Sequence, residues 1–168
     1  MKKPLTKGRL CAIIITEREG KKMKATIFFD MDGTLADLYN VDGWLDYLMS
    51  GDAYPYEAAK PLVRLNVLAR YLNRLQKAGY RIGVISWLAK CDNDEYHVQV
   101  TAAKVNWLHK HLPSVHFDEI HIVKYGTAKE SFAHTTADIL FDDEAPNREH
   151  WTGRAFNVDS ILETLSTL

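Results

Sequence analysis

Six polar side chains at or soon after the ends of short apolar segments could together bind an anionic substrate. They are Asp30, Asp32, Ser86, Lys129, Asp142 and Asp143. Four carboxylates brought close together would repel one another strongly, so they are tolerable mainly around a divalent cation. A ligand set made only of oxygen atoms predicts Mg²⁺, a hard ion that keeps several waters and often bridges to phosphate.

The apolar patterns along the chain predict the elements that would position these side chains. Five strands are expected, at Ala25–Phe29, Tyr80–Ile85, Glu119–Val123, Ala137–Phe141 and Arg154–Val158. Helices are expected at Val41–Ser50, Glu57–Ala78, Tyr96–His111, Thr127–His134, Asn147–Trp151 and Asp159–Thr167. Asp42 and Asp159 are the predicted N-caps of the first and last helices. Strands that alternate with helices indicate an α/β fold, with a mostly parallel sheet of about five strands and helices on both faces.

The parallel sheet would bring the polar residues together, because the carboxyl ends of its strands lie along one edge. Ligands bind outside this edge in such sheets. At this point the sequence resembles the haloacid dehalogenase (HAD) superfamily. The segment Asp30-Met31-Asp32-Gly33-Thr34-Leu35 resembles its first motif, and Ser86 its second. Lys129 resembles the lysine of the third motif, and Asp142-Asp143 the acidic pair of the fourth. The motifs occur in the family's order and span roughly residues 25–158.

The resemblance implies a Rossmann-like HAD fold and a phosphatase that forms an aspartyl-phosphate intermediate. Asp30 would be the nucleophile, and Asp32 would protonate the leaving oxygen and then activate water. Ser86 would bind a phosphoryl oxygen, and Lys129 would neutralise charge on the phosphoryl group. Gly33 would allow the tight turn after the nucleophile, and both Gly33 and Thr34 are expected at the substrate.

The metal set implied by the resemblance consists of Asp30, the main-chain carbonyl of Asp32, Asp142 and Asp143. An anionic carboxylate that attacks an anionic phosphate needs positive charge nearby, which Mg²⁺ and a lysine supply. One residue departs from the family's pattern, and the choice of the third-motif lysine is open. Asn147 stands where many members have a further carboxylate, and Lys124 is an alternative to Lys129.

The stretch between Asp32 and Ser86 is too short for a large cap domain, but residues 37–60 can form a small helical cap. The opening Asp30–Asp37, this short insertion and the segment Ile139–Glu144 resemble the 5'(3')-deoxyribonucleotidase branch and its phage-type relatives. Tyr39, Trp44, Tyr54 and, after the second motif, Trp87 are candidate substrate-binding residues that could stack on a nucleobase. Tyrosine and tryptophan residues that flank a small helical insertion more often form its core. A sugar phosphate or another metabolite as substrate, or a non-catalytic binding protein, remain alternatives.

Composition sets further bounds on the function. The chain has 168 residues, 46% of them hydrophobic, and a formal net charge of −1. This charge argues against binding polymeric nucleic acid by bulk attraction, and the short apolar runs argue against a membrane partner. Two distant cysteines and no visible secretory signal predict a cytoplasmic protein. The resemblance implies that it acts on a small phosphomonoester. Residues 1–22 are expected to form an N-terminal extension, either flexible or an extra strand, before a core domain at 23–168.

Overall fold

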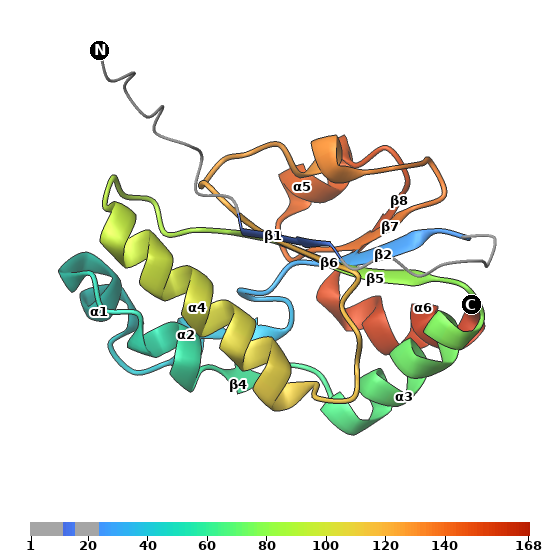
Figure 1. The fold of residues 1–168 in the computed structure, drawn as a ribbon, viewed down its shortest axis with the longest axis horizontal. Helices are drawn as coiled ribbons and strands as arrows, with labels where there is room; N and C mark the ends of the chain where they lie inside the picture. The colour runs from blue at the N-terminus through green and yellow to red at the C-terminus, as the bar shows by residue number, and fades with distance from the viewer. Residues whose placement is uncertain (1–11, 16–23) are drawn as a thin grey trace, which may run out of the picture.

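The computed structural model describes residues 12–15 and 24–168 (Figure 1). Within them, a six-stranded sheet has the order β1-β6-β5-β2-β7-β8. Its strands are β1 (Ala12–Ile15), β2 (Thr26–Phe29), β5 (Arg81–Trp87), β6 (Glu119–Val123), β7 (Ile139–Phe141) and β8 (Arg154–Phe156). All neighbours pair in parallel except β1, which runs antiparallel to β6. The predicted parallel α/β architecture is therefore confirmed.

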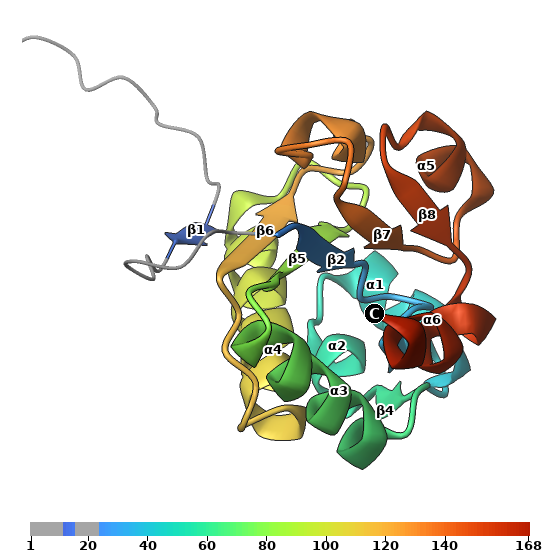
Figure 2. The same ribbon diagram turned by 90° about the vertical axis from the view of Figure 1, so that its right-hand side faces the viewer.

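The extra strand β1 lies at a margin of the sheet, as Figure 2 shows. Ala12 is in register with Ile122 and Ile15 with Glu119. The strand cannot pair with β2, because β2 is hydrogen-bonded to β5 on one side and to β7 on the other. The rest of the expected N-terminal extension lies outside the described residues.

Helices cover the two faces of the sheet unequally. α3 (Leu65–Lys77), α4 (Asp94–His111) and α6 (Ile161–Thr167) lie on one side, while α5 (Ala145–His150) lies on the other (Figure 1). Successive residues of β2 point to opposite faces: Ile27 and Phe29 belong to the larger core, and Phe28 belongs to a smaller one with Trp151. A strand buried on both faces reads as a continuous apolar run, which is why β2 was visible in the sequence.

The predicted helix Glu57–Ala78 is wrong in its first part. α3 begins at Leu65, and its buried residues include the predicted Leu68, Leu72 and Leu75. The preceding residues form a separate short helix, α2 (Tyr54–Ala58), and a two-residue strand, β4 (Lys60–Pro61). Pro61 supplies no backbone N–H and so does not fit a helix interior, and β4 pairs instead with β3 (Ala36–Asp37).

The segment between β3 and β4 forms the small helical cap. It contains a 3₁₀ turn, η1 (Leu38–Asn40), then α1 (Trp44–Ser50) and α2. Gly51 ends α1 in the left-handed conformation, but the N-cap of α1 is Gly43 instead of the predicted Asp42. The cap is fixed to the core at its end, because α2 packs against α4 and the indole N–H of Trp107 donates to the carbonyl of Ala59 at 2.7 Å.

Two further predicted helices differ from the structure. In place of Thr127–His134 there is only the 3₁₀ turn η2 (Lys129–Phe132). The last helix begins at Ile161, after the 3₁₀ turn η3 (Val158–Ser160), whose N-cap side chain is that of Asn157 and not Asp159. None of the helices in the described part of the chain is long and apolar enough to span a membrane.

Candidate active site

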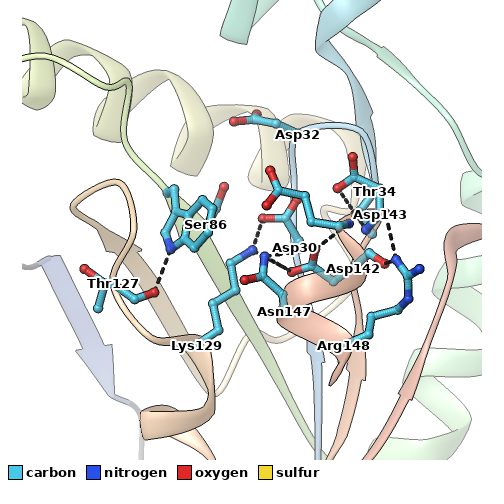
Figure 3. A network of polar contacts seen from close by, with 12 residues as sticks. Asp30, Asp32, Thr34, Ser86, Thr127, Lys129, Asp142, Asp143, Asn147 and Arg148 are labelled. Carbon is cyan, nitrogen blue, oxygen red and sulfur yellow. Dashed lines mark hydrogen bonds and ion pairs between the residues drawn. The ribbon is translucent and has the colours of Figure 1, made fainter. Parts of the chain in front are cut away.

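Three of the predicted residues meet because their strands are neighbours. β2 lies between β5 and β7, and Asp30, Ser86 and Asp142 come at the carboxyl ends of these strands. The amide of Asp30 donates to the carbonyl of Phe141 at 2.9 Å, which continues the ladder one residue beyond β2. All three side chains are buried, so their orientation is fixed by packing. Figure 3 shows this group at the rim of the sheet.

Lys129 joins the acidic residues of β2 and β7. Its Nζ lies 2.7 Å from Asp30 Oδ1 and 2.7 Å from Asp142 Oδ2. Burial would lower the pKa of the Lys129 ammonium, but the charges of Asp30 and Asp142 outweigh burial and raise that pKa well above its usual range. Lys124, the alternative considered for this place, is exposed at the start of the loop after β6. The structure therefore brings Lys129, and not Lys124, to the acidic residues.

The turn that carries Asp142 and Asp143 is fixed by a set of hydrogen bonds. Asn147 Nδ2 donates to both carboxylate oxygens of Asp142 at 3.2 Å, so the amide replaces a further carboxylate with a donor. Arg148 Nη1 donates to the main-chain carbonyls of Asp142 and Asp143 at 2.8 and 2.7 Å, which leaves their carboxylate oxygens free of this guanidinium. Burial and the nearby charges of Asp30 and Asp142 raise the pKa of Asp143 to about 6.

Gly33 and Thr34 shape the site from behind, and neither lines the cavity described below. Gly33 has a φ of +76°, and a Cβ at this position would lie 2.5 Å from Asp143 Oδ2. Thr34 is fully buried; its Oγ1 donates to Asp143 Oδ1 at 3.3 Å and accepts from the amide of Asp143 at 3.1 Å. Thr34 therefore orients Asp143 and Gly33 allows its close approach, while substrate binding by these two residues stays a prediction.

A second buried lysine, Lys104 of α4, was missed from the sequence. Its Nζ lies 2.6 Å from Asp32 Oδ2, 2.8 Å from Ser86 Oγ and 2.6 Å from the carbonyl of Trp87. The Tyr56 ring of the cap covers the ammonium, 5.0 Å from the ring centroid. Burial raises the pKa of Asp32, and the Lys104 charge partly opposes that rise.

The signal for Lys104 is a periodic one. Val100, Lys104, Trp107 and Leu108 follow the spacing of an inward helix face, and all four are buried. A lysine on such a face is rarely buried without a charged partner. In Figure 3 the Asp32 carboxylate points away from Lys129. Lys104 is hydrogen-bonded to Asp32, whereas Lys129 is hydrogen-bonded to Asp30.

A cavity of about 260 Å³ opens between this rim and the cap. Its charged wall contains Asp30, Asp32, Lys129 and the acidic pair, and its remaining wall is largely aromatic and aliphatic. Of the predicted substrate-binding residues, Tyr39, Trp44 and Trp87 line the cavity. Tyr54 does not: it is half-exposed on the outside of the cap and packs against Tyr47, with ring centroids 5.1 Å apart.

The donor set suits Mg²⁺. Among the residues that the structure describes, no three His, Cys, Asp or Glu side chains converge as a ready-made metal site. Lys129 lies between Asp30 and Asp142 instead. Mg²⁺ commonly binds through one or two carboxylates together with waters and substrate phosphate, so it does not require three converging side chains. Burial, and after it the charge of Asp30, raises the pKa of Asp142, while the charge of Lys129 opposes that rise.

Comparison with solved structures agrees with this fold. A HAD-like phosphatase candidate from Mesorhizobium loti has a similar structure, with a TM-score of 0.56 and 13% sequence identity over 94% of this chain and 93% of that chain. A D,D-heptose 1,7-bisphosphate phosphatase from Burkholderia thailandensis is less similar, with a TM-score of 0.49 and 13% identity over 86% and 97% of the two chains. No curated protein matches the chain significantly.

The fold and the arrangement of its rim define a phosphatase of the HAD superfamily. The match to a sequence family is more specific. The model of the 5' nucleotidase, deoxy (pyrimidine), cytosolic type C protein family matches residues 60–166, and the chain belongs to this family. The matched residues include Ser86, Lys104, Lys129 and the acidic pair, whereas Asp30 and Asp32 lie before them. The chain is thus a 5'-nucleotidase-like hydrolase.

Proposed function

We propose that this protein is a Mg²⁺-dependent phosphomonoesterase that acts on nucleoside monophosphates through a phosphorylated Asp30. The observation that carries the proposal is the placement of Asp30 and Asp32 at the end of the central strand β2, beside two buried lysines and an aromatic cavity. Asp30, Asp142, Asp143 and the carbonyl of Asp32 would hold the metal. When bound, Mg²⁺ would offset the charge of the phosphate and of the attacking carboxylate.

The two aspartates that follow β2 have different roles in the proposed reaction. An Asp30 carboxylate oxygen forms a bond to phosphorus while the bond from phosphorus to the ester oxygen breaks. Asp32 donates a proton to the departing oxygen, and burial supports this role because it raises the pKa of Asp32. Water then attacks phosphorus while Asp32 accepts its proton, the bond from phosphorus to the Asp30 oxygen breaks, and inorganic phosphate leaves with the Asp30 carboxylate restored.

The other buried groups bind and orient the phosphoryl group. Lys129 is fixed between Asp30 and Asp142, where its charge can neutralise the phosphoryl oxygens. Lys104 contacts both Asp32 and Ser86, so it can orient the acid and the phosphate-binding hydroxyl together. Both ammonium groups are buried, which strengthens their effect on a phosphate dianion because little water screens them.

The cavity favours a nucleotide over a sugar phosphate. Beyond the charged rim its wall is formed mainly by rings and aliphatic side chains, including Leu38, Trp44, Leu48 and Trp87. A sugar without a base presents hydroxyl groups that would need several polar partners. A nucleobase instead presents a flat face that such rings bind well.

A phosphatase screen tests the proposal. Purified protein is assayed with Mg²⁺ on nucleoside monophosphates and on sugar phosphates, with EDTA as the metal-free condition. Asp30→Asn should lower kcat by at least about 1,000-fold, because it removes the nucleophile. Asp159→Asn is the matched control, because Asp159 is exposed and does not line the cavity, and it should match wild type.

The outcomes separate the parts of the proposal. Retained turnover in Asp30→Asn would exclude the covalent mechanism. If the protein were fully active in EDTA and added Mg²⁺ did not raise its activity, the proposed dependence on Mg²⁺ would be excluded. If sugar phosphates were turned over faster than every nucleotide, the substrate would be wrong although the protein would still be a phosphatase.

A further inference from the structure

One wall of the cavity is formed by a continuous series of rings and ammonium groups that belongs to the core and not to the cap. The Lys129 ammonium lies 5.0 Å from the centroid of the Trp87 ring. The Trp87 and Tyr125 rings contact each other, with centroids 5.0 Å apart and planes at 56°. The Lys90 ammonium lies 5.5 Å from the centroid of the Tyr125 ring. The series therefore extends from the catalytic lysine to a second lysine, and each of its members lines the cavity.

Both rings are held in place by the backbone around them. Trp87 Nε1 donates to the carbonyl of Thr127 at 2.8 Å. The amide of Thr127 donates to the carbonyl of Lys124 at 3.1 Å, which closes a four-residue turn with Tyr125 at its second position. Gly126, the third residue of the turn, has a φ of +79°, as a type II turn requires. The turn presents Tyr125 without depending on any movement of the cap.

Tyr125 is 51% exposed although it lines the cavity and touches Trp87. A tyrosine that only filled a loop core would bury more of its ring, since aromatic side chains gain most from burial. The exposed part is a flat apolar surface with a cation beside it. Such a surface suits a planar ring that carries acceptor atoms.

The cap aromatics are less free to bind a ring. Tyr39 and Trp44 contact each other edge to face, with centroids 5.3 Å apart and planes at 77°. Tyr47 and Tyr54 form a second pair on the outside of the cap. Each of these four cap rings therefore uses part of its surface in packing within the cap. Tyr39 is nevertheless 46% exposed, so what distinguishes Trp87 and Tyr125 is their place between the Lys129 and Lys90 ammonium groups.

We infer that Trp87 and Tyr125 form the platform on which the nucleobase of the leaving group stacks, with Tyr125 as the specificity-determining residue. The inference rests on the proposed nucleotidase function. It assigns base recognition to the end of β5, which also carries Ser86, and to the loop after β6, which leads to Lys129. The phosphate and the base would then be bound by the same rigid part of the molecule.

Deoxyribose 5-phosphate separates base recognition from phosphate chemistry, because it is a deoxynucleotide without its base. We compare kcat/KM for deoxynucleoside 5'-monophosphates with kcat/KM for deoxyribose 5-phosphate and take the ratio as the readout. Stacking on one aromatic side chain typically contributes a factor of about 10 to 100. Tyr125→Ala should lower the ratio by about that factor, mainly through KM, and Tyr125→Phe should restore it because the ring is kept.

Tyr54→Ala is the matched control, because Tyr54 is a half-exposed tyrosine packed on another ring but lies outside the cavity. It should leave the ratio at the wild-type value. A Tyr125→Ala ratio equal to wild type would overturn the inference, as would a base-selective loss found in Trp44→Ala and not in Tyr125→Ala. If wild type showed no preference for nucleotides over deoxyribose 5-phosphate, the proposed function itself would fail. A correct far-ultraviolet circular dichroism spectrum and Tm confirm that each variant is folded.

Discussion

Replacing Lys104 by methionine should destabilise the protein in a pH-dependent way. Methionine keeps an unbranched stem but removes the ammonium that contacts Asp32 Oδ2 at 2.6 Å and Ser86 Oγ at 2.8 Å. The lysine side chain is fully buried and the aspartate side chain is 18% exposed. Breaking a buried ion pair by removing one partner typically costs about 3–5 kcal/mol, so we expect about 3 kcal/mol for this pair, whose aspartate retains some contact with water.

The sign of the pH dependence follows from the carboxyl group that is left behind. Burial already raises the pKa of Asp32 in the folded protein above its ordinary value of 3.8. Without Lys104 the pKa rises further, so the folded protein binds a proton that the unfolded chain releases. Stability then falls as pH rises between the two pKa values, by up to about 1.4 kcal/mol per pH unit. Lys104→Met should therefore be less harmful at pH 5 than at pH 8.

Urea unfolding followed by tryptophan fluorescence at pH 5 and pH 8, in EDTA, measures this effect. Lys110→Met is the matched control, because Lys110 is exposed on the same helix, and it should change stability by less than about 0.5 kcal/mol. In the double variant with Asp32→Asn the losses should be less than additive, by about 1–3 kcal/mol. Additive losses, or an equal effect of Lys104→Met at both pH values, would refute the buried pair.

Three further predictions follow from the geometry. Gly33→Ala should lower the free energy of unfolding by about 1–3 kcal/mol more than Gly126→Ala, as measured by urea unfolding. Both glycines have positive φ, but only at Gly33 would a Cβ meet Asp143 Oδ2, at 2.5 Å. Equal losses would contradict this close approach. Glu119→Gln should flatten the acid loss of Tm below about pH 4.5. Burial raises the pKa of Glu119, but the hydrogen bonds from His121 and His134 outweigh burial, so the net pKa is lowered. The ionised Glu119 therefore stabilises the fold above that pH, and this contribution is lost on acidification. A Tm profile between pH 3 and 7 that Glu119→Gln left unchanged would exclude this role. Trp107→Phe should cost about 1–3 kcal/mol in urea unfolding, because the carbonyl of Ala59 loses its indole donor, and a neutral result would show that this bond is not needed to fix the cap.

The sheet could be predicted from the sequence because its central strands carry an unbroken apolar signal. β2 and β7 are buried on both faces, and each ends at a polar residue, so their boundaries are sharp. The cap could be placed but not resolved. Its helices have only seven and five residues, too few turns for a periodic pattern, and Pro61 interrupts what looked like one long helix.

The candidate site was predictable where a residue lies at a strand end and less so where it comes from a helix. Asp30, Ser86 and Asp142 follow strands that adjoin in the sheet, so topology alone brings them together. Lys104 reaches the same place from the middle of α4, and its partner Asp32 is 72 positions away. Such a pair depends on how a helix is rotated about its axis, which periodicity suggests but does not fix. The positions of Thr34 and Tyr54 outside the cavity could not be predicted for a similar reason, because residue type does not tell which way a side chain points.

The first and last residues of the cap segment lie side by side, which bears on how the length of the cap could vary. Ala36 of β3 is in register with Pro61 of β4, so the chain leaves and re-enters the core at neighbouring points. The entropy of closing a loop between fixed ends grows only slowly with its length. The core would therefore accept a longer, shorter or unrelated segment between these strands with little change to β2 or to the residues at its end. The cap can therefore vary in length and sequence while the reacting groups, and the proposed base-binding residues Trp87 and Tyr125, remain where they are.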